Sequence, residues 1–160
     1  MSKIVQADLV RASALGDELD KSEAQTLANQ MASRTVNDGQ ILVREGGPER
    51  TLFVLVAGQL IVSNTRGDHE QVAYVMNKGE CAGARSFVDA MPRRATLRAS
   101  GPTTVYTLEP EGFETLVDSH PRIVYKVMRA MFRITHTNLL RMNQEAQQLT
   151  EYVTKTHGRY

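Results

Sequence analysis

The chain has 160 residues, of which 41% are apolar and 23% charged, so it can bury the core of a soluble domain, and wholesale disorder is not expected. Nineteen basic and 18 acidic residues give a net charge of +1, which argues against a protein built to coat nucleic acid or an anionic membrane. A single cysteine, Cys81, excludes an internal disulfide, and no Cys/His cluster offers a zinc site. No apolar run approaches the roughly 20 residues that span a bilayer, and the first residues do not form a signal peptide. A cytoplasmic protein is therefore expected.

Charge is distributed unevenly along the chain. Residues 1–120 contain 12 basic and 16 acidic residues, whereas residues 121–160 contain 7 basic and 2 acidic ones. The last forty residues are therefore a basic segment attached to a mildly acidic body. This pattern fits the solvated face of a helix, or else a contact with an acidic partner or with nucleic acid.

Helices are predicted at the N-terminal end. Ser22 and Gln25 have the spacing of a capping box, which satisfies two free amides at the start of a helix. An earlier helix is expected over residues 4–15, ending near Gly16. Residues 1–33 are therefore predicted to form an N-terminal helical region.

Residues 34–120 are predicted to form a β-barrel or β-sandwich, because short β-prone runs alternate with glycine turns. The expected strands are residues 41–43, 51–56, 60–63, 71–75, 95–99 and 103–108. The turn at residues 57–59 makes a hairpin of the second and third strands, and Gly101-Pro102 separates the last two. A short helix is expected over residues 110–118, with a proline in its first turn.

Residues 121–160 are predicted to form one long helix that serves dimerisation. Pro121 opens it, and the sequence then has no further proline, and no glycine before Gly158. About 36 residues of uninterrupted helix is far longer than a usual globular helix and is typical of a coiled coil.

Two apolar stripes run along this helix. The first stops early and comprises Val124, Val127, Met131, Ile134 and Asn138. The second keeps the alternating spacing of a coiled-coil seam for two more heptads and comprises Met128, Phe132, Thr135, Leu139, Met142, Ala146, Leu149 and Val153. The first stripe is expected to lie on the barrel and the second to meet the same helix of another subunit in a parallel homodimer. The alternative is a helix folded back on its own domain.

A motif in the central zone resembles a known cassette. The motif consists of Gly79-Glu80-Cys81-Ala82-Gly83-Ala84-Arg85-Ser86-Phe87 and Met91-Pro92-Arg93-Arg94-Ala95-Thr96-Leu97. It is similar to the phosphate-binding cassette of the cyclic nucleotide-binding domain family. Around it, residues 39–41 resemble the opening strand of that family, residues 52–62 its central hairpin, and residues 113–121 its helical hinge and the start of its C-helix. The resemblance covers about residues 36–145. It implies a mainly β fold with flanking helices (α+β), namely a jelly-roll β-barrel plus a long C-terminal helix, which senses a ligand and carries no catalysis.

The cassette suits a compact monoanion such as a cyclic phosphate. Backbone amides after Gly83 can donate to the anion, and an arginine adds a charge-assisted bond. Arg93 matches the phosphate arginine of the family, although without a ligand it could form a surface salt bridge. The full set of candidate ligand-binding residues is Gly83, Ala84, Arg85, Ser86, Arg93, Arg94, Ala95, Thr96 and Asn138.

One position departs from the family pattern. After the cassette glycine the family usually has a glutamate that accepts a hydrogen bond from the ribose 2′-hydroxyl, and here the residue is Ala84. Three interpretations remain open. The pocket binds cyclic AMP or cyclic GMP weakly, it binds another ligand such as cyclic di-GMP through the additional arginines, or it is degenerate and the domain is a dimeric protein-interaction scaffold. Asn138 lies where the family often contacts the base, or it is only a polar residue at the end of a buried stripe.

Enzymatic motifs are absent from the sequence. There is no nucleophile elbow, P-loop or paired-carboxylate site, and the four histidines are scattered. No DNA-reading helix-turn-helix is expected after the C-helix. We therefore expect a non-enzymatic sensor that acts through an effector protein, with no cofactor, no metal and no nucleic-acid or membrane partner.

Overall fold

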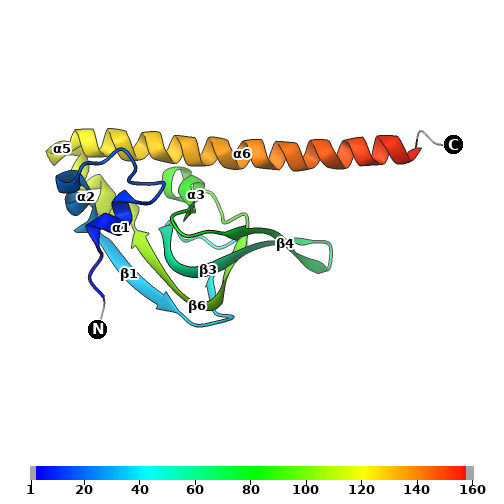
Figure 1. Ribbon diagram of the computed structural model, residues 1–160, viewed down its shortest axis with the longest axis horizontal. Coiled ribbons are helices and arrows are strands. Elements are labelled where there is room, and N and C mark those ends of the chain that lie inside the picture. The colour runs from blue at the N-terminus through cyan, green and yellow to red at the C-terminus, as the bar shows by residue number, and fades with distance from the viewer. Residues whose placement is uncertain (1–2, 158–160) are drawn as a thin grey trace.

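Strands and short helices are packed beneath one long C-terminal helix in the computed structural model, which describes residues 3–157 (Figure 1). The expected N-terminal region and C-helix extend to residues 1–2 and 158–160, which lie outside the described residues. None of the described helices is long and apolar enough to cross a membrane.

The first helix is shorter than predicted. Helix α1 covers only Ala7–Arg11, whereas the prediction extended over residues 4–15. The hydroxyl of Ser13 donates to the carbonyl of Val10 at 2.6 Å and helps turn the chain away from the helical path. The segment after α1 is therefore a tight loop.

Helix α2 (Lys21–Ala28) begins with a different capping box from the predicted one. The Asp20 carboxylate accepts the N–H of Glu23 at 2.8 Å, and the Glu23 carboxylate accepts the N–H of Asp20 at 3.0 Å. The prediction of Ser22 and Gln25 as the box was therefore wrong. A carboxylate at the cap also interacts favourably with the positive end of the helix dipole.

The sheet is antiparallel throughout. Its strands are β1 (Met31–Val36), β2 (Ile41–Val43), β3 (Leu52–Arg66), β4 (His69–Met76), β5 (Cys81–Ala82) and β6 (Thr96–Leu108). The order is β1-β6-β3-β4, with β2 paired to β6 and β5 paired to β3. This arrangement confirms the predicted mainly β fold with flanking helices.

Strands β3 and β6 are each continuous where the sequence suggested an interruption. The predicted hairpin at residues 57–59 was wrong, because Gly58 bends β3 without reversing it. Gly58 has φ +86°, and a Cβ there would collide with the Pro102 carbonyl of β6. The register between the two strands shifts on either side of Ala57. Bulges of this kind curve a sheet, and here they let two long strands wrap the barrel.

The remaining helices are α3 (Ala84–Asp89), α4 (Pro110–Glu114), α5 (Leu116–Ser119) and α6 (Pro121–His157). The single helix predicted over residues 110–118 is therefore two helices, α4 and α5, separated at Thr115. The hydroxyl of Thr115 donates to the Gly112 carbonyl at 2.6 Å.

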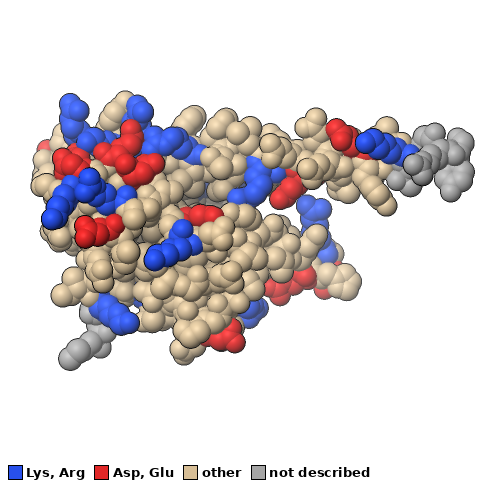
Figure 2. Space-filling model, viewed as in Figure 1, with Lys and Arg blue, Asp and Glu red and all other residues tan. Residues whose placement is uncertain are grey.

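The first half of α6 completes the core. Ile123, Val127 and Met131 are buried in one apolar cluster with Leu52 and Val54 of β3. The first predicted stripe of α6 therefore lies on the barrel, as expected. Further along, the helix runs past the barrel into solvent (Figure 1). Figure 2 shows basic and acidic side chains interleaved near the start of α6, whereas much of the projecting part carries neither.

Candidate functional site

The cassette contains a glycine that no other residue could replace without movement. Gly83 is the N-cap of α3 and has φ +92°, in the left-handed region that favours glycine. A Cβ at this position would collide with the guanidinium of Arg93 and would lie 2.8 Å from the Thr51 carbonyl oxygen. The absent side chain is thus what allows Arg93 to lie against the backbone at the start of α3.

Arg93 is buried, with only 5% of its surface exposed. Its Nη2 donates to the carbonyl of Thr51 at 2.5 Å, and its guanidinium carbon lies 5.5 Å from the centre of the Phe53 ring. Its backbone pairs with the loop before β3, because its N–H donates to the Gly47 carbonyl at 3.0 Å and its carbonyl accepts the N–H of Gly46 at 2.7 Å. Arg93 is therefore held at both its backbone and its side chain.

The guanidinium of Arg93 is incompletely satisfied. Within the described part of the chain, its Nε has no hydrogen-bond partner and is shielded from solvent. Burial lowers the pKa of Arg93, while the negative charges of Glu49 and Glu109 act in the opposite direction. A buried cation with a free donor is a favourable place for an anion to bind.

The other cassette candidates divide into two groups. Ala84 and Ser86 are buried in the first turn of α3, directly after Gly83. Arg85 and Arg94 are exposed, and therefore do not share the buried position of Arg93.

Ala95 and Thr96 are half-buried at the start of β6. The Thr96 hydroxyl accepts the backbone N–H of Glu45 at 3.0 Å. In this structure Thr96 therefore helps to pair two segments of the barrel.

Sequence reasoning missed Arg50, which ties the segment before β3 to α3. Its Nε donates to the carbonyl of Ser86 at 3.3 Å, and its Nη2 to that of Phe87 at 2.8 Å. These bonds satisfy carbonyls of a short helix and fix α3 relative to Thr51. No sequence signal distinguishes Arg50 from other arginines, because its partners are backbone atoms of a distant segment.

Asn138 lines a cleft of about 310 Å³ between α6, β4 and the turn before β5. In this cleft the Tyr74 hydroxyl donates to the Glu80 carboxylate at 2.8 Å, and the guanidinium carbon of Arg141 lies 3.7 Å from the centre of the Tyr74 ring. Burial raises the pKa of Tyr74, and the bond to Glu80 adds to this shift. Arg93 does not line the cleft, so the structure does not bring Asn138 and Arg93 into one cavity.

The predicted seam of α6 faces solvent in the single chain. Its large apolar side chains are between 38 and 73% exposed, and these are Met128, Phe132, Leu139, Met142, Leu149 and Val153. Thr135 and Ala146, which complete the seam, are also exposed. These residues therefore form a largely apolar, solvent-exposed stripe along the described part of α6.

A model of the cyclic nucleotide-binding domain family matches residues 33–120, more than half of the chain. The cAMP-dependent protein kinase regulatory subunit of Dictyostelium discoideum is 28% identical over 102 residues, which are 61% of this chain and 31% of that protein. The chain spans less than a third of the length of the curated relatives that it matches.

Solved structures share the fold. A cyclic nucleotide-binding domain from Methylobacillus flagellatus has a TM-score of 0.78 at 22% identity, covering 89% of this chain and 79% of that one. The regulatory domain of Toxoplasma gondii PKA, crystallised with cAMP, has a TM-score of 0.63 at 24% identity, covering 72% of this chain and 45% of that one. The jelly-roll barrel with its C-terminal helix is therefore the fold of this chain.

Proposed function

Because the chain belongs to the cyclic nucleotide-binding domain family, we propose that it is a non-enzymatic regulatory module that binds cyclic AMP or cyclic GMP and signals through a partner protein. The relatives include a cAMP-dependent protein kinase regulatory subunit. The proposal assigns the ligand to the cassette formed by α3 and Arg93, and assigns dimerisation to the exposed seam of α6.

The observation that carries this proposal is the buried guanidinium of Arg93 beside Gly83. Among the described residues its Nε has no partner, and its one side-chain hydrogen bond goes to the neutral carbonyl of Thr51. A cyclic phosphate that replaced this carbonyl would exchange a neutral acceptor for an anionic one, which adds charge attraction and can accept from two N–H groups of the guanidinium. The energy of that exchange would favour phosphate binding.

Binding should be weak, for a reason that lies at Ala84. An alanine offers no acceptor to a ribose 2′-hydroxyl, and losing a bond to a charged acceptor costs about 1.5–3 kcal/mol, or roughly 10- to 150-fold in affinity. The ligand must also compete with the Thr51 carbonyl for Arg93. Both effects lower affinity for a mononucleotide without excluding it.

A second candidate function is a dimeric protein-interaction scaffold with a degenerate pocket. The observation that favours it is the packing of Arg93 on Thr51 and Phe53, which fills the space beside Gly83 with the protein's own side chain. A third candidate is a sensor of cyclic di-GMP, whose second phosphate would bind the exposed Arg85 and Arg94.

The homodimer is part of the proposal. The seam repeats every seven residues and remains exposed over the projecting half of α6. A second copy offers the same repeat, so two parallel helices would bury each other's side chains as knobs into holes. The large exposed area of Phe132 and Leu139 makes them the main expected contributors.

Calorimetric titration of the purified protein with cyclic AMP, cyclic GMP and cyclic di-GMP tests the proposed ligand. We expect binding heat with a mononucleotide and none with the Arg93→Ala variant. The Arg94→Ala variant is the matched control, because it removes an exposed arginine from the adjacent position. A dimeric protein that gives no heat with any of the three nucleotides would support the scaffold.

A further inference from the structure

Thr51 lies at a junction between the cassette and the end of the barrel. It comes directly before β3, where its neighbour Leu52 pairs with Leu108 of β6. Its backbone carbonyl accepts the Nη2 of Arg93 at 2.5 Å, whereas its hydroxyl donates to the carboxylate of Glu109 at 2.6 Å. One residue therefore joins the buried cation of the cassette to the acidic residue that follows β6.

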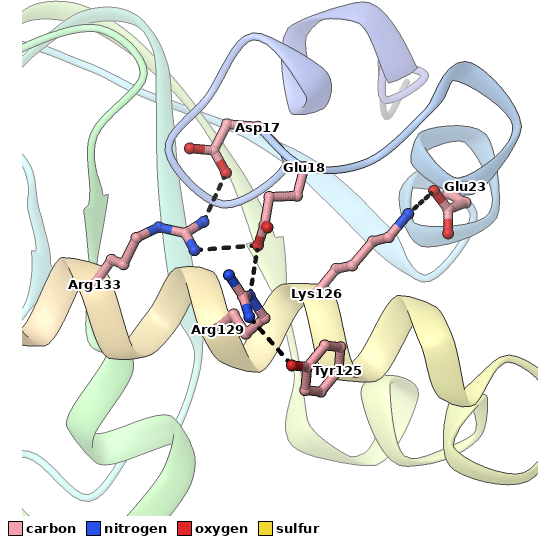
Figure 3. A network of polar contacts seen from close by, with 7 residues as sticks. All are labelled: Asp17, Glu18, Glu23, Tyr125, Lys126, Arg129 and Arg133. Carbon is pink, nitrogen blue, oxygen red and sulfur yellow. Dashed lines mark hydrogen bonds and ion pairs between the residues drawn. The ribbon is translucent and has the colours of Figure 1, made fainter.

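The Glu109 carboxylate bonds Thr51 rather than a helix or a cation. Glu109 is the N-cap residue of α4, but its side chain makes no capping hydrogen bond. Figure 3 shows three acidic side chains that instead pair with basic residues of α6, namely Asp17, Glu18 and Glu23. Within the part of the chain that the structure describes, Glu109 forms no ion pair of this kind. Its carboxylate is therefore available to hold Thr51 in place.

The segment that ends at Thr51 follows the cassette closely. The carbonyl of Gly47 accepts the N–H of Arg93 at 3.0 Å, and the Nη2 of Arg50 donates to the carbonyl of Phe87 at 2.8 Å. Thr51 adds the bond to the Arg93 guanidinium. Because a hydroxyl bond to a carboxylate is charge-assisted, the Glu109 contact restrains the residue whose carbonyl Arg93 uses.

Charge alone does not distinguish Glu109 from its acidic neighbour Glu49. Burial lowers the pKa of Arg93, and the charges of both carboxylates counteract this, Glu49 more than Glu109. The Glu49 side chain lies over Gly47, because a Cβ on that glycine would collide with its carboxylate. The hydrogen bond to Thr51 is therefore the feature that gives Glu109 a separate role.

We propose that the Glu109 carboxylate and the Thr51 hydroxyl form a lock that holds Arg93 against the backbone. With the lock closed, the Thr51 carbonyl is fixed where Arg93 needs an acceptor. With the lock open, the carbonyl can move and the guanidinium is released toward an anion. Thr51 and Glu109 are thus positioning residues that act through Arg93. The consequence for nucleotide affinity rests on the proposed function, whereas the effect on Arg93 does not.

The test is the Thr51→Val variant, which removes the hydroxyl but keeps the side-chain shape, the backbone carbonyl and both nearby carboxylates. The first measurement needs no nucleotide. Phenylglyoxal adds to accessible guanidinium groups, and peptide mass spectrometry gives its rate at the buried Arg93 relative to the exposed Arg94. We expect this ratio to rise about 2- to 10-fold, because the lost bond is exposed to water and contributes modestly. An unchanged or lower ratio would overturn the lock.

The second measurement is calorimetric titration with cyclic AMP and cyclic GMP. Thr51→Val should bind the mononucleotide about 2- to 10-fold more tightly than the wild type, because the ligand no longer has to break a fixed bond of Arg93. If the wild type binds and the variant gains nothing, the lock does not limit affinity. If Arg93 labelling rises but neither protein binds a mononucleotide, the lock stands and the proposed function fails.

Two variants separate the hydroxyl from general loosening of the barrel. Thr51→Ser keeps the hydroxyl and should match the wild type in both measurements. Thr107→Val makes the same substitution in β6, where the hydroxyl donates to the Ala32 carbonyl at 3.4 Å, and should also leave Arg93 labelling unchanged. Thermal melting shows that each variant remains folded. Release of Arg93 by Thr51→Ser, or an equal release by Thr107→Val, would show that the lock is not its cause.

Discussion

The cassette and the projecting half of α6 differ in how many contacts their side chains make with the rest of the chain. In the cassette, Arg93 is buried against Thr51 and Phe53, and Arg50 bonds the carbonyls of α3. On the projecting half of α6, large apolar side chains such as Leu149 remain in solvent. In the cassette the side chain of Arg93 is already bound by the protein itself, whereas on the projecting half of α6 the apolar side chains face solvent.

This difference determines how each region could gain a partner. A ligand at the cassette has to displace an existing bond of Arg93, so its binding energy is reduced by the energy of that bond. A partner at the α6 seam displaces only water from apolar surface, which is favourable in itself. The seam should therefore bind its partner more strongly than the cassette binds a nucleotide.

The largest expected effect is at the seam. Replacing Leu139 and Leu149 by glutamate places four charges in the proposed dimer interface, where none could be solvated. We expect the double variant to sediment as a monomer at concentrations where the wild type is a dimer. Leu140→Glu is the matched control, because Leu140 is 48% exposed but lies off the seam. A wild type that is monomeric at high concentration, or a double variant that stays dimeric, would show that the seam has another role.

The next largest effect is at Arg93. Its replacement by alanine removes the only buried cation of the cassette, and truncating one partner of a buried charge pair costs about 2–5 kcal/mol. We expect calorimetry to show no binding of either mononucleotide to a variant that thermal melting shows to be folded. Binding that survived in Arg93→Ala but vanished in Arg94→Ala would place the phosphate at the exposed arginine.

The two halves of α6 should also respond differently to truncation. Met131 is 2% exposed in the core, so Met131→Ala should lower the free energy of unfolding by about 2–5 kcal/mol. Met142 is 53% exposed, so Met142→Ala in the monomeric double variant should change it by less than about 0.5 kcal/mol. Chemical denaturation measures both values. Equal losses would mean that the projecting half folds back onto the barrel.

Much of the fold could be predicted from the sequence, because periodicity and proline positions report local structure. The start of α6 at Pro121 and its first apolar stripe were predicted correctly. Gly58 was read as a turn, yet it bends a continuous strand, because a glycine with positive φ serves a turn and a bulge equally well. Only the pairing of β3 with β6 distinguishes the two, and this pairing joins residues far apart in the sequence.

The geometry of the candidate site was predictable only in part. The cassette glycine and Arg93 lie in one motif, and the structure places them in contact. The role of Arg50 and the carbonyl of Thr51 could not be predicted, because a backbone acceptor has no residue-specific signature. The separation of Asn138 from Arg93 depends on how α6 is seated, which no local pattern encodes.

The smallest expected effect is a gain at Ala84. This residue is buried in the first turn of α3, next to Gly83. A glutamate there would return an acceptor for the ribose 2′-hydroxyl, and a bond to a charged acceptor contributes about 1.5–3 kcal/mol, so the affinity for cyclic AMP or cyclic GMP should rise about tenfold or more. Ala84→Gln separates the effect of charge from that of side-chain shape, since its neutral acceptor should give a smaller gain in affinity in the same titration.

If the Ala84→Glu protein binds neither mononucleotide, the bond between Arg93 and Thr51 keeps the cassette closed. The cassette would then resemble the rest of the core, and the α6 seam would be the functional surface of the domain.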